Sequence, residues 1–315
     1  MGKFTLFSIV ISEVHMWWEI VKSLLVFMLI VVGFILLLLL PRDLEVIHHG
    51  GFVFTSQYPF TFELFKENIQ AFIQYFQTEK GFGINRYGVP IIEEVQKYIK
   101  RDLYLIIPAF SLSIIFGTLL GIVQFYFREK FIGRVQAIFS WIFSSVPDFF
   151  FFIAIQYLLI KLFHLGFPKF SLYGNDHWYN FFVPMIALTI FPLLYMVKFT
   201  AASLENEVGQ DYLRTARAKG LRPTSVLKHM LWNCLYSIFN QTQFIMLYIL
   251  SSLPIIEKLS SYQGAGYHLL GSIQAHEDER ALAFMLPFLI LMFVTILFSK
   301  LVKFWTVPQK SGDLR

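Results

Sequence analysis

The sequence predicts an all-α membrane protein with six transmembrane helices and both termini in the cytoplasm. The first observation is composition: 56% of the 315 residues are hydrophobic and only 15% are charged, whereas soluble domains carry about 25% charged residues. The second is that long uncharged runs recur, and about 18 apolar residues already suffice for a spanning helix. The third is an excess of Lys and Arg in alternate loops. We expect helices, because lipid offers no partner for unpaired backbone groups.

Each of the six predicted spans is a long apolar stretch. Together they form one transmembrane domain that covers the whole chain, residues 1–315. The spans cover residues 23–40, 103–127, 135–163, 181–200, 231–253 and 281–302. Pro147 breaks the third span, and Pro192 and Pro287 lie inside the fourth and sixth. Interior prolines are tolerated where neighbouring helices satisfy the freed carbonyls, so they indicate a packed bundle.

Basic residues cluster in the segments that we place in the cytoplasm. These are Lys3, Lys22, Arg128, Lys130, Arg134, Arg214, Arg217, Lys219, Arg222, Lys228, Lys300, Lys303, Lys310 and Arg315. The two short outer loops and their span ends hold only Lys161, Lys169, Lys258 and Arg280. Because cytoplasmic loops carry an excess of Lys and Arg, we expect residues 204–230 inside and residues 41–102 outside.

The outer segment 41–102 is expected to be ordered on the membrane face. Its stretch "FELFKENIQAFIQYFQ" has apolar residues at helical spacing, and the glycine-rich turn region "GFGINRYGVP" follows. After Pro90, "IIEEVQKYIK" predicts an amphipathic helix that leads into the second span. The first seventeen residues, with Trp17 and Trp18, are expected at the membrane interface, where aromatic rings prefer the headgroup level.

The basic stretch "DYLRTARAKGLRPTSVLKHM", residues 211–230, predicts two short helices set at an angle by one glycine. Asp211 is the expected N-cap, and Gly220 fits the left-handed position that ends a helix. Lys219 lies where the helix dipole favours a cation. Pro223 suits the first turn of the next helix.

Side chains of this stretch divide into two faces. Tyr212 and Ala216 are four residues apart on one face, whereas Arg214 and Arg217 lie on another. The small side chains of Ala216 and Ala218 would let another surface approach closely. The alternative is a solvated basic loop that only follows the excess of positive charge inside.

The stretch "QDYLRTARAKGL" resembles the cytoplasmic-loop signature of ABC importer permeases of the oligopeptide/dipeptide/nickel class. The general importer motif is Glu-Ala-Ala, three residues, then Gly. Arg214, Thr215 and Ala216 stand at the three leading positions, with Gly220 as the glycine. An arginine in place of the acidic residue is the habit of the peptide branch.

This resemblance implies a type I ABC importer permease fold and a coupling helix that docks into a groove on an ATPase subunit. The coupling residues it implies are Asp211, Tyr212, Arg214, Thr215, Ala216, Arg217, Ala218, Lys219 and Gly220.

Other stretches carry the same resemblance over nearly all of the chain. "SSVPDFFFFIAI", "LGFPKF" and "LPIIEKLSSYQGAGYHLLGSI" are similar to the family's third span, the turn after it and the loop after the fifth span. The outer segment resembles that of the first permease of the pair. The chain departs from the family in a longer N-terminus, in "AHEDER" at 275–280 and in the tail "VPQKSGDLR".

Four polar residues inside the predicted spans are candidates for the translocation pathway. Asp148 follows Pro147 and is the one plainly intramembrane charge, which makes it a functional candidate by default. The alternative is that it caps the segment after Pro147. Asn240, Gln241 and Gln243 lie in the fifth span. They could hydrogen-bond across helices or line the pathway for peptide backbone groups.

No residue pattern predicts a metal site, a bound cofactor or catalysis. His276 and the acids beside it have no ligand spacing, so we expect residues 275–280 to be a solvated charge run that could touch a partner protein. Cys234 is expected to be a small buried side chain. The sequence has no phosphate-binding loop, serine nucleophile elbow or H-E-x-x-H motif. ATP and Mg would therefore bind on partner subunits.

The predicted function is a transmembrane permease subunit of an ATP-driven importer for oligopeptides or dipeptides in the bacterial cytoplasmic membrane. The resemblance implies a second homologous permease, two ABC ATPase subunits and an extracytoplasmic solute-binding lipoprotein as partners. The spans contact membrane lipid, and we expect no nucleic-acid partner. One alternative is a nickel or metal-chelate importer. Another is a secondary carrier or channel, although no inverted repeat is visible in the sequence. An intramembrane enzyme lacks any nucleophile–base pair.

Overall fold

The computed structural model describes residues 2–42, 45–50, 52, 54–57, 60–168 and 173–306; for residues 2–17, 45, 57 and 303–306 it describes the backbone but not the side chains. The helices are α1 (Gly2–Leu38), α2 (Phe62–Glu79), α3 (Ile91–Tyr126), α4 (Phe131–Phe143), α5 (Asp148–His164), α6 (Phe182–Glu207), α7 (Asp211–Ala218), α8 (Pro223–Asn240), α9 (Thr242–Ser260), α10 (Ala265–Gln274) and α11 (Asp278–Thr306), with strands β1 (Glu45–His48) and β2 (Phe54–Gln57) and the 3₁₀ turn η1 (Trp178–Phe181). The expected interfacial position of Trp17 and the tail at 307–315 lie outside the described residues.

The protein is an all-α membrane protein, as predicted. Among the described residues, five helical segments are long and apolar enough to cross a membrane, and the bent pair α4–α5 raises the number to six. One of the five runs from Pro223 to Ser260 and combines α8 with α9. The helix that follows Gly220 is α8. It is longer than predicted, because it continues from the basic stretch into the fifth span.

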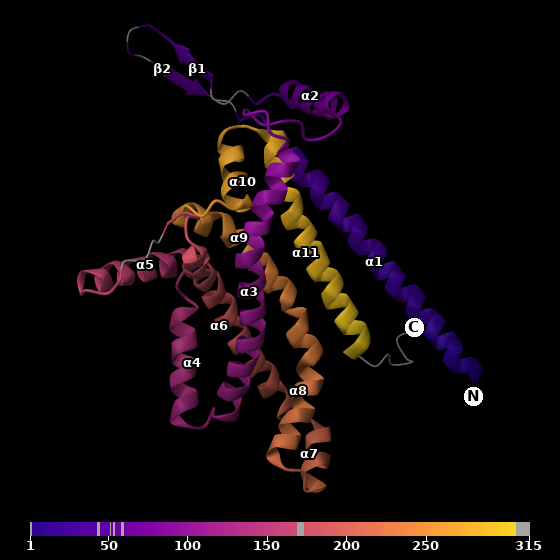
Figure 1. Cartoon of the computed structure of the whole chain (residues 1–315). Coiled ribbons are helices and arrows are strands. Elements are labelled where there is room, and N and C mark those ends of the chain that lie inside the picture. Colours follow the sequence, from indigo (N-terminus) through magenta and orange to yellow (C-terminus); the bar gives the residue numbers. More distant parts are fainter. Residues whose placement is uncertain are drawn as a thin grey trace.

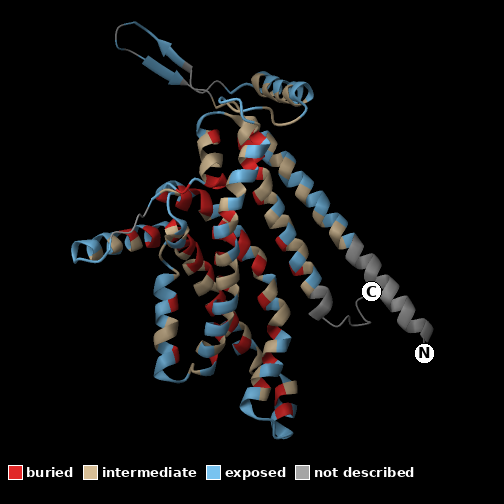
Figure 2. Ribbon diagram, in the orientation of Figure 1, coloured by how far each residue is buried: buried red, intermediate tan, exposed pale blue. Residues whose placement is uncertain are grey.

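The core forms where α3, α6 and α9 meet. Figure 2 shows buried residues concentrated along these helices, with α1 largely exposed at the edge of the bundle. Leu105, Leu188 and Ile249 are fully buried there. The Ser113 hydroxyl of α3 also donates to the Thr189 carbonyl of α6 at 3.3 Å, a cross-helix bond of the kind that small polar residues make in membranes.

The third predicted span changes direction where the sequence places its break. α4 ends at Phe143, α5 begins at Asp148, and the two helices are bent by 101°. Figure 1 shows α5 projecting sideways from the bundle. Proline at 147 cannot continue the helix hydrogen bonding of α4, which explains the break; the size of the bend depends on packing against α6 and α9.

The two ends of the bundle carry different structures. The hairpin β1–β2, α2 and α10 lie at one end, and α7 lies at the opposite end (Figure 1). α2 is the helix that the sequence predicts in the outer segment. Thr61 caps it: the Thr61 hydroxyl oxygen accepts the Leu64 N–H at 3.1 Å. The hairpin pairs Glu45 with Gln57; the sequence analysis predicted no strand there.

Candidate functional site

The basic helix α7 begins one residue earlier than predicted. Gln210 is the N-cap in extended conformation, and Asp211 is already the first helical residue. The prediction that Asp211 is the N-cap is therefore wrong. Its carboxylate pairs instead with Arg214 at 3.5 Å, one helical turn away. An acid in the first turn still favours the helix, because it faces the positive end of the dipole.

The end of α7 matches the predicted glycine turn. Gly220 has φ +72°, and its N–H donates to the Arg217 carbonyl at 2.9 Å. The Leu221 N–H reaches back to the Ala216 carbonyl at 3.3 Å. These two bonds define a Schellman cap, and α8 then starts at Pro223, as predicted. The direction of α7 relative to α8 therefore depends on one left-handed residue.

One face of α7 is anchored on its own subunit. Leu213 and Ala216 are only 2% and 8% exposed. The half-buried Tyr212 donates its hydroxyl to Glu207 at the end of α6. Burial, and then the Glu207 carboxylate, raises the pKa of Tyr212 to about 12, so the phenol remains a donor. Ala216 thus packs against its own chain, and of the two small residues only Ala218 is exposed to another surface.

The opposite face of α7 presents cations to solvent. The Arg214 side chain is 81% exposed, and Arg217, Ala218 and Lys219 are exposed as well. Figure 1 shows α7 at the tip of the bundle. A short helix that is fixed on one side and cationic on the other can bind an acidic groove, and a push on it passes directly to α6 and α8.

Asp148, a predicted pathway residue, is the first residue of α5 and is 8% exposed. Its Oδ1 accepts the N–H of the next residue, Phe149, at 2.8 Å. Pro147 is the N-cap of α5 and no side chain caps the helix, so the capping alternative is wrong. Asp148 Oδ2 is buried and accepts no hydrogen bond from the described residues. The Tyr248 phenol of α9 interacts with the same carboxyl group. Asp148 is therefore a buried carboxyl group in the first turn of α5 with one oxygen that has no partner among the described residues.

The other predicted pathway residues do not form one site. The Tyr195 hydroxyl of α6 donates to Gln241 at 2.7 Å, and the Ser299 hydroxyl of α11 is 3.4 Å from the Asn240 oxygen that accepts it. Both bonds join helices, which favours the role of cross-helix contacts. Gln243 is half-buried on α9, two residues beyond Gln241, where α8 and α9 meet.

The sequence analysis missed Lys198, a second charge inside the spans. It lies on α6, half-buried, and its ammonium group donates to the Ser144 hydroxyl at the α4–α5 break. Asp148 is thus not the only intramembrane charge. The signal was a single lysine in an otherwise uncharged stretch, and such a residue is a functional candidate by default.

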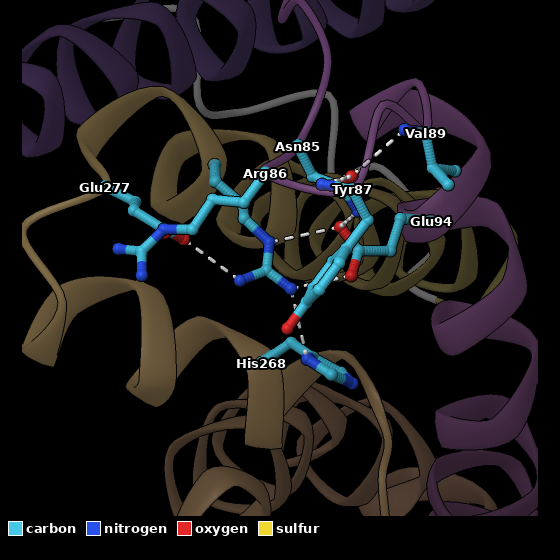
Figure 3. Close-up of polar contacts among 8 residues, drawn as sticks. Asn85, Arg86, Tyr87, Val89, Glu94, His268 and Glu277 are labelled. Atoms are coloured by element: carbon cyan, nitrogen blue, oxygen red, sulfur yellow. Dashed lines mark hydrogen bonds and ion pairs between the residues drawn. The ribbon is translucent and has the colours of Figure 1, made fainter.

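The charged stretch 275–280 is not the solvated run that the sequence predicted. Arg280 binds Glu94 through two nitrogens, at 2.6 and 3.1 Å, and Glu277 at 3.0 Å. Arg86 reaches Glu277 at 2.6 Å. Figure 3 shows these contacts gathered between the outer segment and α10–α11. The prediction failed because the opposite charges come from residues about 190 positions earlier, which no local pattern reveals.

Two further buried carboxyl groups were missed because they lie at the edges of predicted spans. Asp102 of α3 and Glu257 of α9 are both 0% exposed. Ionisable groups are almost never fully buried unless they are paired. The complete burial of Asp102 and Glu257 therefore requires a structural or functional explanation, as does the burial of Asp148.

Comparisons with known proteins agree with this arrangement. Residues 113–310 match the family model described as "Binding-protein-dependent transport system inner membrane component". The glutathione transport system permease protein GsiC of Escherichia coli (strain K12) is 28% identical over 210 residues, 65% of this chain and 67% of that protein. The protein of the same name from Shigella dysenteriae serotype 1 (strain Sd197) is equally similar, and that of Salmonella choleraesuis (strain SC-B67) is 27% identical over the same shares. The family match contains α7 and all four predicted pathway residues.

Proposed function

The chain belongs to the family of binding-protein-dependent transport system inner membrane components, and from this premise we propose how its exposed basic helix works. The protein is a permease subunit of an ABC importer of the oligopeptide/dipeptide class and a multi-pass protein of the cytoplasmic membrane. The finer proposal is that α7 is the coupling helix. ATP-driven closure of an ATPase pair moves α7, and α6 and α8 carry that movement into the spans.

One observation carries this proposal: α7 is anchored on one face and free on the other. The anchored face has Leu213 and Ala216 buried and Tyr212 bonded to Glu207. The free face carries Arg214 and Arg217. A solvated loop that only follows the positive-inside rule needs neither the buried face nor the Schellman cap.

The proposed partners follow from the family. They are a second homologous permease, two ABC ATPase subunits that bind ATP and Mg, and an extracytoplasmic solute-binding protein. The chain itself forms half of the pathway and has no catalytic role. The substrate we propose is a short peptide or peptide-like solute, since the similar permeases are named for glutathione transport. Stimulation of the assembled complex's ATPase by glutathione, but not by nickel chelates, would support this choice; the reverse would favour the metal-chelate alternative.

The coupling role is tested by reversing the charge of the free face with Arg214→Glu/Arg217→Glu. Both side chains are exposed, so the variant should insert normally. We expect the ATPase subunit retained on purified permease to fall about tenfold or more, because close like charges across an interface cost several kcal/mol and 1.4 kcal/mol is about tenfold.

The matched control is Lys97→Glu/Lys100→Glu, also three residues apart and exposed, on the part of α3 near α10. It changes the net charge equally at the end of the bundle opposite α7. We expect it to retain the ATPase subunit. Equal retention by both variants would contradict docking at α7.

A further inference from the structure

The N-terminus of α10 is capped by two carboxyl groups from different helices. Asp102 Oδ1 accepts the Ala265 N–H at 2.8 Å, and Asp102 Oδ2 accepts the Gly266 N–H at 3.3 Å. Glu257 Oε2 accepts the Tyr267 N–H at 2.6 Å. A helix leaves its first N–H groups without intrahelical partners, and here α3 and α9 supply the acceptors. These bonds therefore join α10 to both spans.

The two carboxyl groups also meet each other. A Cβ placed on Gly264 would lie 2.0 Å from Asp102 Oδ1 and 2.1 Å from Glu257 Oε1. Both oxygens therefore lie close to the same point beside the glycine, and so close to each other. Glu257 Oε1 is buried and accepts no hydrogen bond from the described residues. Two ionised carboxylates cannot remain this close in a fully buried place, because one of the pair gives up its charge. A proton on Glu257 Oε1, donated to Asp102, satisfies both oxygens.

The remaining oxygens are already engaged by backbone N–H groups. The pair consequently has no free oxygen with which to bind a solute, and its effect is on the position of α10. Gly264 is required by close approach and not by its backbone angle, since its φ is −99°.

The rest of α10 is fixed to the same neighbours. The His268 ring contacts Tyr98 of α3 in a tilted arrangement, with centroids 3.9 Å apart, and stacks on Phe284 of α11 at 5.5 Å. Its Nδ1 lies 3.4 Å from an Arg280 nitrogen within the cluster of Figure 3. α9 is thus connected through α8 to α7 at one end of the bundle and through Glu257 to α10 at the other.

We infer that Asp102 and Glu257 form a clasp that shares one proton and holds α10 to α3 and α9, so that α10 moves with these spans. Glu257 carries the proton and Asp102 the charge. The inference rests on the proposed importer function for its consequence, which is that transport requires the closed clasp. The attachment of α10 to α3 and α9 through this clasp does not depend on the importer function.

The test compares four variants in the assembled complex in nanodiscs, with a spin label on Gln274→Cys of α10 in a Cys234→Ser background. Glu257→Gln keeps a neutral donor facing Asp102 and an acceptor for Tyr267, so label mobility should stay as in the parent. Asp102→Asn replaces one acceptor with an N–H donor that faces a backbone N–H, so mobility should rise.

Two glycine variants provide a matched pair on the same segment. Gly264→Ala drives a methyl group into both carboxyl groups and should behave like Asp102→Asn. Gly271→Ala lies in open space on α10 and should behave like the parent. Uptake of a labelled tripeptide should stay within about twofold for Glu257→Gln and Gly271→Ala, and should fall about tenfold or more, one 1.4 kcal/mol step, for the other two.

Correct insertion and assembly are checked first by gel filtration of each complex. Unchanged mobility in Asp102→Asn, or equal loosening in Glu257→Gln and Asp102→Asn, would overturn the shared proton. Loss of peptide uptake in the parent complex, with the mobility pattern intact, would instead contradict the proposed substrate and leave the clasp supported.

Discussion

At the scale of single residues, several roles could be predicted from sequence because they depend on local backbone chemistry. Gly220 was predicted to be left-handed and has φ +72°, and Pro223 was predicted at a helix start and begins α8. Roles that depend on distant partners could not be predicted. Glu94 and Arg280 bind each other across the chain, and Asp102 meets Glu257 only after folding.

His268 gives a prediction at this scale, because its environment disfavours the charged ring. Burial, and then the positive charge of Arg280, lowers the pKa of His268 to about 4, whereas an unfolded chain has a histidine pKa of about 6.5. Between these values the unfolded state binds more protons, so stability is lost as pH falls from about 6.5 towards 4.

We expect the melting temperature of the purified protein to decrease over this pH window, and to decrease less in His268→Gln. Thermal unfolding of both proteins at a series of pH values measures the difference. Parallel curves would show that His268 does not contribute to the pH dependence.

At the scale of elements, hydrophobic runs were sufficient to predict where helices lie but not how they turn. Pro147 in the apolar run at 135–163 predicted a broken third span, but the bend of 101° was not predicted, because it involves contacts of α4 with α3 and α6 and of α5 with α6 and α9. α3 begins at Ile91 and extends through the second span as one helix, although Pro108 lies inside it, as interior prolines can where neighbouring helices satisfy the freed carbonyls. The hairpin β1–β2 was missed, since two four-residue strands carry too weak a pattern.

The orientation of α7 is an element property that one residue controls. Gly220→Trp places a side chain on a left-handed residue, which costs about 1–2 kcal/mol for an L-amino acid. No atom lies within 4 Å of the added Cβ, so the Cβ itself meets only the strain of the left-handed backbone. We expect uptake per inserted permease to fall about tenfold or more, since 1.4 kcal/mol is about tenfold.

Gly209→Trp is the matched control at the other end of α7, because Gly209 has open space and no left-handed backbone. It should transport normally. Normal uptake by Gly220→Trp, or equal loss in both variants, would count against an orientation set by the Gly220 turn.

At the scale of the whole molecule, the bundle has two specialised ends connected by α8–α9. α7 lies at one end and α10 at the other (Figure 1), and from the excess of basic residues around α7 we propose that this end faces the cytoplasm. The fold class followed from composition and apolar runs alone. The location of the pathway did not, because its candidates Asn240 and Gln241 hydrogen-bond to neighbouring helices within this subunit and the other half belongs to the second permease that we propose.

The central claim is that the chain moves solute only when a separate ATPase acts on α7. The most direct measurement is uphill uptake of a labelled tripeptide into proteoliposomes that contain either the full complex with ATP or the purified chain alone. We predict accumulation by the complex, none by the chain alone, and none by a complex that carries Arg214→Glu/Arg217→Glu. Accumulation against a gradient by the chain alone would contradict the account.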